Sequence, residues 1–101
     1  KQQMIKFKGT TLFPQIIFNV LNMMPQIELF QIEVARDEFN NDSVTVLLNS
    51  ALKSDEFEHN LLSLFKSILR VTPHIVFITE QELHSRIFKT DKRKPEKIVY
   101  V

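Results

Sequence analysis

Charged side chains that could do chemistry gather near the end of the chain. Between Arg86 and Lys97 the sequence has six basic residues and only two acidic ones, whereas the whole chain has a formal net charge of +1. Three interpretations stay open from the residue types alone. The run is ordinary solvated surface charge, a nucleic-acid contact, or a loop from which one lysine reaches a phosphate as a point charge. Near this run, Phe88 and Tyr100 offer little of the aromatic stacking that nucleic-acid binding needs, which disfavours that interpretation.

The other candidate groups are three histidines and one acidic stretch. His59, His74 and His84 share no helical face with each other or with carboxylates at metal-ligand spacing, so we interpret each as structural or solvent-exposed. The chain has no cysteine and a single glycine, which excludes disulfides, thiolate metal sites and a glycine-rich phosphate loop. The stretch 37–42 lacks the glycine and the ligand spacing of an EF-hand. We therefore predict no metal site.

Hydrophobic periodicity predicts the elements that must position the basic run. Pro14 suits the first turn of a helix, and Ser54 is a good N-cap for a longer one. In chain order, the predicted elements are a strand over 4–8, a turn over 9–11, a helix from 13–14 to Pro25, strands over 28–35 and 43–48 around a polar hairpin loop, a helix over 54–69, a strand over 74–78, a short helical turn over 80–86 and a strand from 98 onward.

This order predicts one α+β domain over residues 1–101. We expect a small ferredoxin-like sandwich, with two helices packed on one face of a three- to four-stranded, mostly antiparallel sheet. The length fits one domain, and the composition, 44% hydrophobic and 25% charged, is typical of a soluble globular domain. No apolar run approaches the roughly 20 residues of a membrane span, and no signal peptide is apparent. We therefore expect a cytoplasmic protein that binds neither membrane nor nucleic acid.

The order of residues adds a resemblance. Met4–Pro14 (MIKFKGTTLFP) resembles a block just past the domain hinge of the phenylacetate–coenzyme A ligase family, in which a basic residue and a glycine precede Phe-Pro and a helix. Phe30-Gln31-Ile32 is similar to the strand that follows there, and the segment around Lys94 resembles the lysine-containing end of the family. The resemblance covers essentially the whole chain, as the small C-terminal domain of an AMP-forming ligase.

The resemblance implies a mobile lid. Such enzymes form an acyl-adenylate from a carboxylic acid, here aromatic or related, and ATP with Mg²⁺, and then pass the acyl group to coenzyme A. The partner of the chain would be its own N-terminal catalytic domain, and the isolated chain would be inactive and hold none of these cofactors tightly. Lys94 is the implied catalytic residue, with Lys92 and Lys89 as alternatives. Gln2 and Gln3 would lie on the hinge side.

The same resemblance places Lys8, Gly9, Thr10 and Thr11 on the interdomain or coenzyme A-facing surface. Because the sequence starts at Lys1 rather than Met and ends in an apparent strand, we expect it to be part of a longer protein.

Several positions depart from the family pattern. Gln2 and Gln3 replace paired carboxylates, Phe18 stands where an acidic residue is expected, and Arg93 replaces the glycine before the lysine. Pro95 restricts the residue before it to extended backbone. These departures indicate a divergent paralogue that activates a different acid or is inactive.

Two functions other than that of an enzyme domain stay open. In the first, the chain is a stand-alone ferredoxin-like regulatory or RNA-binding module. In the second, it is a module that forms a homodimer through Phe18, Met23 and Met24. Phe18 falls off the main apolar stripe of its helix and could therefore be an exposed contact.

Overall fold

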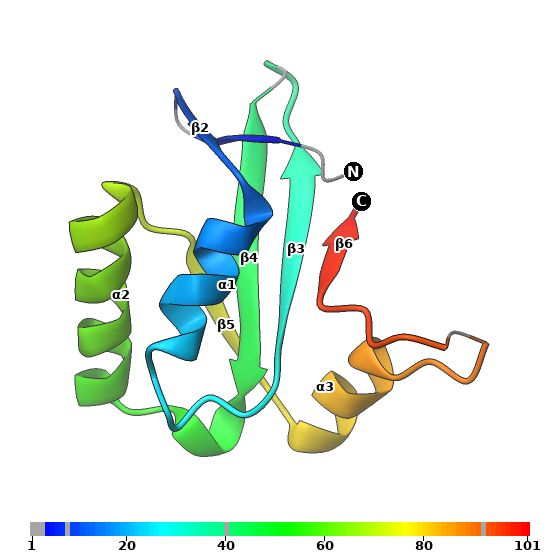
Figure 1. Cartoon of the computed structure of the whole chain (residues 1–101). Helices are drawn as coiled ribbons and strands as arrows, with labels where there is room; N and C mark the ends of the chain where they lie inside the picture. Colours follow the sequence, from blue (N-terminus) through cyan, green and yellow to red (C-terminus); the bar gives the residue numbers. More distant parts are fainter. Residues whose placement is uncertain (1–3, 8, 40, 92) are drawn as a thin grey trace.

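A computed structural model describes residues 4–7, 9–39, 41–91 and 93–101 of the chain. Figure 1 shows a sheet with helices beside it and a small separate hairpin. The elements are, in order, β1 (Ile5–Phe7), β2 (Thr10–Leu12), α1 (Pro14–Asn22), β3 (Phe30–Arg36), β4 (Asp42–Asn49), the 3₁₀ turn η1 (Ser50–Leu52), α2 (Asp55–Leu69), β5 (His74–Ile78), α3 (Glu80–Ile87) and β6 (Ile98–Tyr100).

The main sheet has four strands in the order β5-β4-β3-β6. Its central pair, β3 and β4, is antiparallel, while each edge strand is parallel to its neighbour. The sheet is therefore mixed, where the sequence favoured a mostly antiparallel one. The reason lies in the connections: α2 carries the chain back before β5 begins, and after α3 the chain re-enters at the end of the sheet where β3 starts (Figure 1).

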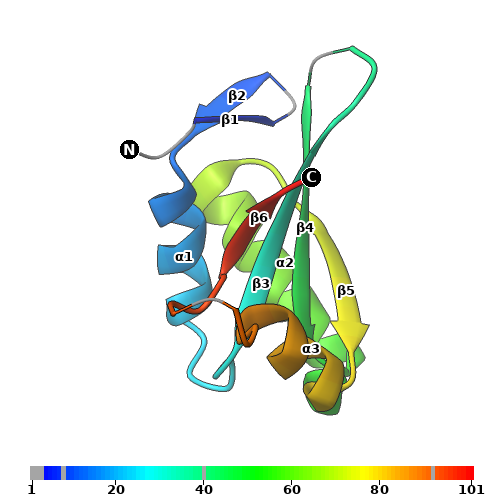
Figure 2. The ribbon, with the colours of Figure 1, turned by 90° about the vertical axis from the view of Figure 1, so that its right-hand side faces the viewer.

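The predicted layering is confirmed, because α1 and α2 pack on one face of this sheet (Figure 2). Strand alternation directs one set of side chains toward the helices, and helical periodicity directs the matching set back. The buried hydrophobic residues of this core are Ile5, Phe7, Leu12, Ile17, Val20, Leu21, Phe30, Ile32, Val34, Val44, Val46, Leu48, Phe57, Leu61, Phe65 and Leu69.

The ends of α1 and α2 follow the signals in the sequence. Pro14 is the first residue of α1, where its missing N–H costs nothing. The Ser54 hydroxyl accepts a hydrogen bond from the Phe57 amide at 3.0 Å and caps α2, as predicted. At the other end of α2, Arg70 takes the left-handed conformation, with φ 65°.

Helix α3 covers one end of the opposite sheet face. Leu83 and Ile87 are fully buried there and form a second cluster with Leu47 of β4. The Thr79 hydroxyl accepts from the Glu82 amide and caps the helix. The sequence predicted only a short helical turn, and the buried pair explains the full helix, because packing rather than propensity stabilises most short helices.

The hairpin β1–β2 is tighter than the sequence indicated. Thr10 and Thr11 were expected in the turn, but they pair with Phe7 and Lys6 as strand residues. Gly9 supplies the positive φ, 79°, that this shorter turn requires. In the part of the chain described here, no helix is both long and apolar enough to cross a bilayer.

Candidate functional site

Residues 88–97 form the basic loop, which leaves α3 and returns to β6. Its two arms meet at a narrow neck. The Glu96 amide donates to the Ile87 carbonyl at 2.8 Å, and the Ile32 amide of β3 donates to the Lys97 carbonyl at 2.8 Å. The loop is therefore fixed where it joins the sheet, while its tip projects from the side of the molecule (Figure 1).

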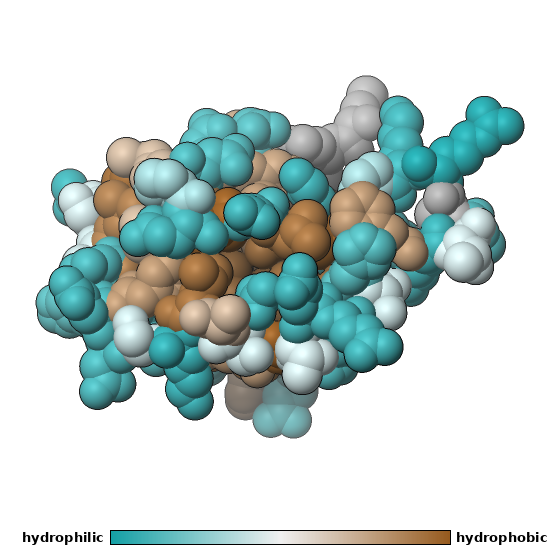
Figure 3. Space-filling view, turned by 90° about the horizontal axis from the view of Figure 1, so that it is seen from below, coloured by the Kyte–Doolittle hydropathy of each residue, from teal (hydrophilic) through white to brown (hydrophobic). Residues whose placement is uncertain are grey.

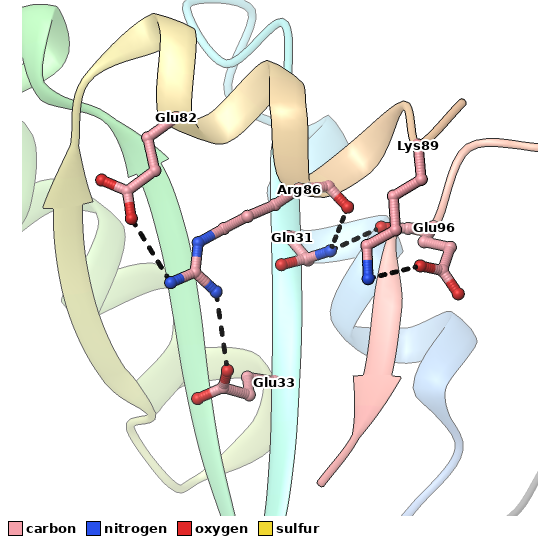
Figure 4. A network of polar contacts seen from close by, with 6 residues as sticks. All are labelled: Gln31, Glu33, Glu82, Arg86, Lys89 and Glu96. Carbon is pink, nitrogen blue, oxygen red and sulfur yellow. Dashed lines mark hydrogen bonds and ion pairs between the residues drawn. The ribbon is translucent and has the colours of Figure 1, made fainter. Parts of the chain in front are cut away.

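A buried glutamine side chain spans the neck. The Gln31 Nε2 atom of β3 donates to the Arg86 carbonyl at 3.1 Å and to the Glu96 carbonyl at 2.9 Å. Gln31 is only 2% exposed, so its side chain donates from a buried position. Figure 4 shows the carboxamide reaching both arms of the loop.

Three of the six cations in and beside the loop have partners in the fold. Arg86 lies 3.4 Å from Glu82 on its own helix and 3.9 Å from Glu33 on β3, and Lys89 lies 3.5 Å from Glu96 across the neck (Figure 4). The Lys97 ammonium sits 5.3 Å from the centre of the Phe30 ring, a cation–π contact. These side chains serve the structure of the loop.

Arg93 and Lys94 differ from those three. Both are exposed, and neither makes an ion pair or side-chain hydrogen bond to any other described residue. Lys92, the second candidate, lies outside the described residues. Of the three lysines singled out by the sequence, Lys89 is paired and Lys94 is free to meet an external anion.

A hollow elsewhere on the surface suits an anion less well. It has a volume of about 260 Å³, lies at the end of the sheet where α3 begins, and includes two carboxylates and no basic side chain. Its lining residues are Gln26, Glu28, Leu29, Asn49, Ala51, Leu52 and Glu80. Figure 3 views the molecule from this end and shows hydrophobic side chains gathered near the centre, with hydrophilic ones around them. A phosphate would find its positive partner in the basic loop instead.

The predicted interdomain surface maps to the separate hairpin. Gly9 and Thr11 are exposed there and Thr10 is half-buried, whereas Lys8 lies outside the described residues, as do Gln2 and Gln3, which were predicted on the hinge side. Beside the hairpin, an apolar groove of about 490 Å³ runs between α1 and α2. Whether this surface faces coenzyme A or another domain stays a prediction.

The hairpin is attached to the sheet through Asp42. This buried carboxylate accepts a hydrogen bond from the Lys6 amide at 2.7 Å and lies 3.5 Å from the Arg36 Nε atom. Tyr100 of β6 lies on the same end of the sheet. Partial burial, and then the negative charge of Asp42, raise the pKa of the Tyr100 phenol above its usual value, because both disfavour the phenolate.

The three histidines are exposed and lie on different elements, α2, β5 and α3. His84 stacks near Phe88, with ring centres 4.6 Å apart. Within the described residues, no group of three or more His, Asp or Glu side chains could hold a metal ion.

Phe18 corrects one expectation. Its side chain is half-buried against the core, and its ring centre lies 5.6 Å from that of Phe30. Phe30, the first residue of β3, packs against Phe18. Helical periodicity alone left Phe18 outside the apolar stripe of α1, because it takes no account of this contact. Met24 is also partly buried, while Met23 is exposed, and a homodimer through these residues stays untested.

Reasoning from the sequence missed Gln31 as part of the site. The signal was present, because a polar residue between Phe30 and Ile32 points to the face opposite the main core. What the sequence could not reveal is that α3 and the basic loop cover that face, which leaves the amide buried.

Comparisons with known proteins bear on the fold. No family model matches the chain, and no curated protein matches it. A crystallised domain of phenylacetate–coenzyme A ligase from Bacteroides vulgatus has a TM-score of 0.67 and 21% identity, and the match covers 99% of this chain and 93% of that one. A 2-hydroxyisobutyryl-CoA ligase in complex with 2-HIB-AMP and CoA, in its thioesterification state, has a TM-score of 0.64 and 15% identity.

The second match covers 98% of this chain but only 21% of the ligase. This chain thus corresponds in size to the crystallised domain and to about a fifth of the other enzyme. The resemblance drawn from Met4–Pro14 and the segment around Lys94 is confirmed at the level of the fold: the chain folds as a domain of a phenylacetate–coenzyme A ligase does.

Proposed function

We propose that the chain is the C-terminal mobile domain of a phenylacetate–coenzyme A ligase-like enzyme. Such an enzyme forms an acyl-adenylate from a carboxylic acid and ATP and transfers the acyl group to coenzyme A. The observation that carries the proposal is the shared fold over 99% of this chain and 93% of the phenylacetate–coenzyme A ligase domain. The sequence block ending at Pro14 and the free lysine of the basic loop support it independently.

In this proposal Lys94 stabilises charge. ATP supplies the adenylyl group, Mg²⁺ offsets phosphate charge, and coenzyme A supplies the acceptor thiol. The carboxylate and the α-phosphate are both anionic, so a cation held between them lowers the barrier to their reaction. In this proposal Mg²⁺ would be held by the catalytic domain, and this chain would contribute an ammonium group.

The geometry of the basic loop suits that role. A cation that acts in a neighbouring domain must be exposed and unpaired, and its backbone must be rigidly attached to the fold. An already ordered donor costs little reorganisation during the reaction. Lys94 is exposed and has no described partner, and the neck two residues later is held by backbone and side-chain hydrogen bonds. Closure of the domain over the site would also exclude water from a reactive adenylate.

The test compares the two half-reactions in the protein that carries this chain together with its catalytic domain. Lys94→Ala should slow adenylate formation, measured by ATP–pyrophosphate exchange, by about 10²–10³-fold. It should leave transfer from a preformed acyl-adenylate to coenzyme A nearly unchanged. Arg93→Ala is the matched control, because Arg93 is the adjacent residue, equally exposed and unpaired among the described residues.

Equal rates for Lys94→Ala and wild type in both half-reactions would overturn the role of Lys94. The proposal as a whole would fail if the protein activated no carboxylic acid, tested with phenylacetate and related aromatic and short hydroxy acids. Tight and steeply salt-dependent binding of single-stranded RNA by the chain would favour a binding module in its place.

A further inference from the structure

We propose that Gln31 is the positioning residue of the basic loop, and that its carboxamide sets the direction in which Lys94 leaves the fold. The catalytic part of this inference rests on the function proposed above. Its structural part, a side chain that clamps the loop, stands on the geometry of the neck alone.

The clamp is a buried donor shared by two acceptors. Arg86 lies in the last turn of α3, where carbonyl groups lack partners within the helix. The Gln31 amide supplies one hydrogen bond to that carbonyl and a second to the Glu96 carbonyl on the returning arm. A neutral carboxamide has two N–H groups, so one side chain of a central strand satisfies both arms at once.

The neighbouring contacts are not equivalent to this clamp. The Lys89–Glu96 pair also spans the neck, but the Lys89 side chain is half exposed, and exposed ion pairs contribute little. The backbone bonds from Glu96 and Ile32 close the neck. Gln31 is the buried side chain that ties the end of α3 and the returning arm to the same strand.

The clamp reaches Lys94 through a stiff link. Glu96 is fixed through both its amide and its carbonyl, and only Pro95 separates it from Lys94. The proline ring fixes φ at residue 95, and a residue that precedes proline is restricted to extended backbone. Holding Glu96 therefore limits the positions that the Lys94 backbone can reach, while its side chain stays free.

Two substitutions and one matched control separate the clamp from general packing. Gln31→Met keeps much of the volume and removes both N–H donors. Glu33→Gln is the matched control, because Glu33 lies on the same strand and the same face and contacts Arg86, but it touches neither carbonyl of the neck. Pro95→Gly frees the link to Lys94 at an exposed position and leaves the core intact.

The first experiment measures amide hydrogen exchange in the chain, whose fold matches a domain crystallised on its own. In Gln31→Met, amides of the basic loop, with Glu96 as the reporter, should exchange about tenfold faster or more, since loss of a buried donor leaves two carbonyls unsatisfied. Amides in the β3–β4 ladder should keep wild-type rates, as should the loop in Glu33→Gln. Unchanged loop exchange in folded Gln31→Met would overturn the clamp.

The second experiment uses the enzyme that contains the catalytic domain. Gln31→Met and Pro95→Gly should each lower kcat for adenylate formation about tenfold or more, with little change in KM for ATP and acid. In a Lys94→Ala background neither should cost anything further, because both act through Lys94. If Gln31→Met does not fold, Pro95→Gly becomes the test of whether the link between Glu96 and Lys94 positions the lysine. Wild-type adenylation by Pro95→Gly would refute the stiff link.

The two proposals fail in different ways. If Lys94→Ala is harmless while loop exchange responds to Gln31→Met, the clamp stands and the catalytic role is lost. If Gln31→Met slows adenylation equally with and without Lys94, Gln31 acts through general stability and is not a positioning residue.

Discussion

The Nζ atom of Lys89 lies 3.5 Å from the Oε1 atom of Glu96, so an ion pair joins the two arms of the basic loop. This contact distinguishes Lys89 from Lys94, although the two residues are only five positions apart and equally basic. A lysine engaged by a carboxylate must lose that partner before it can meet a phosphate, whereas Lys94 has no such partner among the described residues.

We therefore predict that Lys89→Ala reduces adenylate formation far less than Lys94→Ala. The free energy of unfolding should fall by about 0–1 kcal/mol, because the pair is partly exposed and screened by salt. Urea titrations at low and high salt and the exchange assay would measure the two effects. A loss of adenylation as large as that of Lys94→Ala would identify Lys89 as the catalytic lysine.

Tyr100 predicts a dependence of stability on alkaline pH. Burial first, and the charge of Asp42 second, raise the pKa of its phenol above 10.0. The folded chain therefore holds this proton more tightly than the unfolded chain. The resulting stabilisation is fully present below pH 10 and is lost as the pH rises through the folded pKa.

The chain suits this measurement, because it has one tyrosine and no tryptophan. The absorbance of the phenolate should report a pKa above the ordinary value in the folded chain, and Asp42→Asn should lower it without restoring it fully, since burial remains. A wild-type titration at the value of an unfolded peptide would contradict the arrangement around Tyr100.

Arg70 offers a stabilising substitution. It ends α2 in the left-handed conformation, with φ 65°, which is costly for any residue with a Cβ atom. Arg70→Gly should raise the free energy of unfolding by about 0.5–1 kcal/mol, after allowance for the greater freedom of glycine in the unfolded chain. Arg70→Ala, which removes the side chain but keeps Cβ, should give no such gain in a denaturant titration.

The two capped helices should respond differently to loss of their caps. Ser54→Ala removes the hydroxyl that accepts from Phe57 and should cost about 1 kcal/mol of global stability, because α2 contributes four residues to the main core. Thr79→Ala removes the equivalent bond in α3. Since α3 buries only Leu83 and Ile87, this loss should appear mainly as faster amide exchange near Glu82.

Features fixed by local sequence were the ones that could be predicted. The first residue of α1 follows from Pro14 and the start of α2 from Ser54, because each acts on backbone groups within one helical turn. The alternation around Ile32 and Val46 likewise predicted the central hairpin and the face that it buries. The resemblance of the N-terminal block pointed to the domain fold.

Features set by distant contacts could not be predicted. Whether β6 runs parallel or antiparallel to β3 depends on where the chain leaves α3. The residues Ile98–Tyr100 themselves carry no signal for this direction. Gln31 lies 55 positions before Arg86 and 65 before Glu96, so no local pattern connects these residues. The lysines look alike in the sequence, and only their partners in space separate Lys89 from Lys94.

The narrow neck of the basic loop also affects how such a domain can evolve. Because the Glu96 amide is bonded to the Ile87 carbonyl and the next carbonyl, that of Lys97, is bonded to Ile32 of β3, residues added or lost between Ile87 and Glu96 leave the strand register untouched. Natural selection can therefore lengthen or shorten the basic loop, or change its charge, without destabilising the core. Related domains should differ most in length here, and a change of acyl substrate could be accompanied by a new loop on an unaltered scaffold.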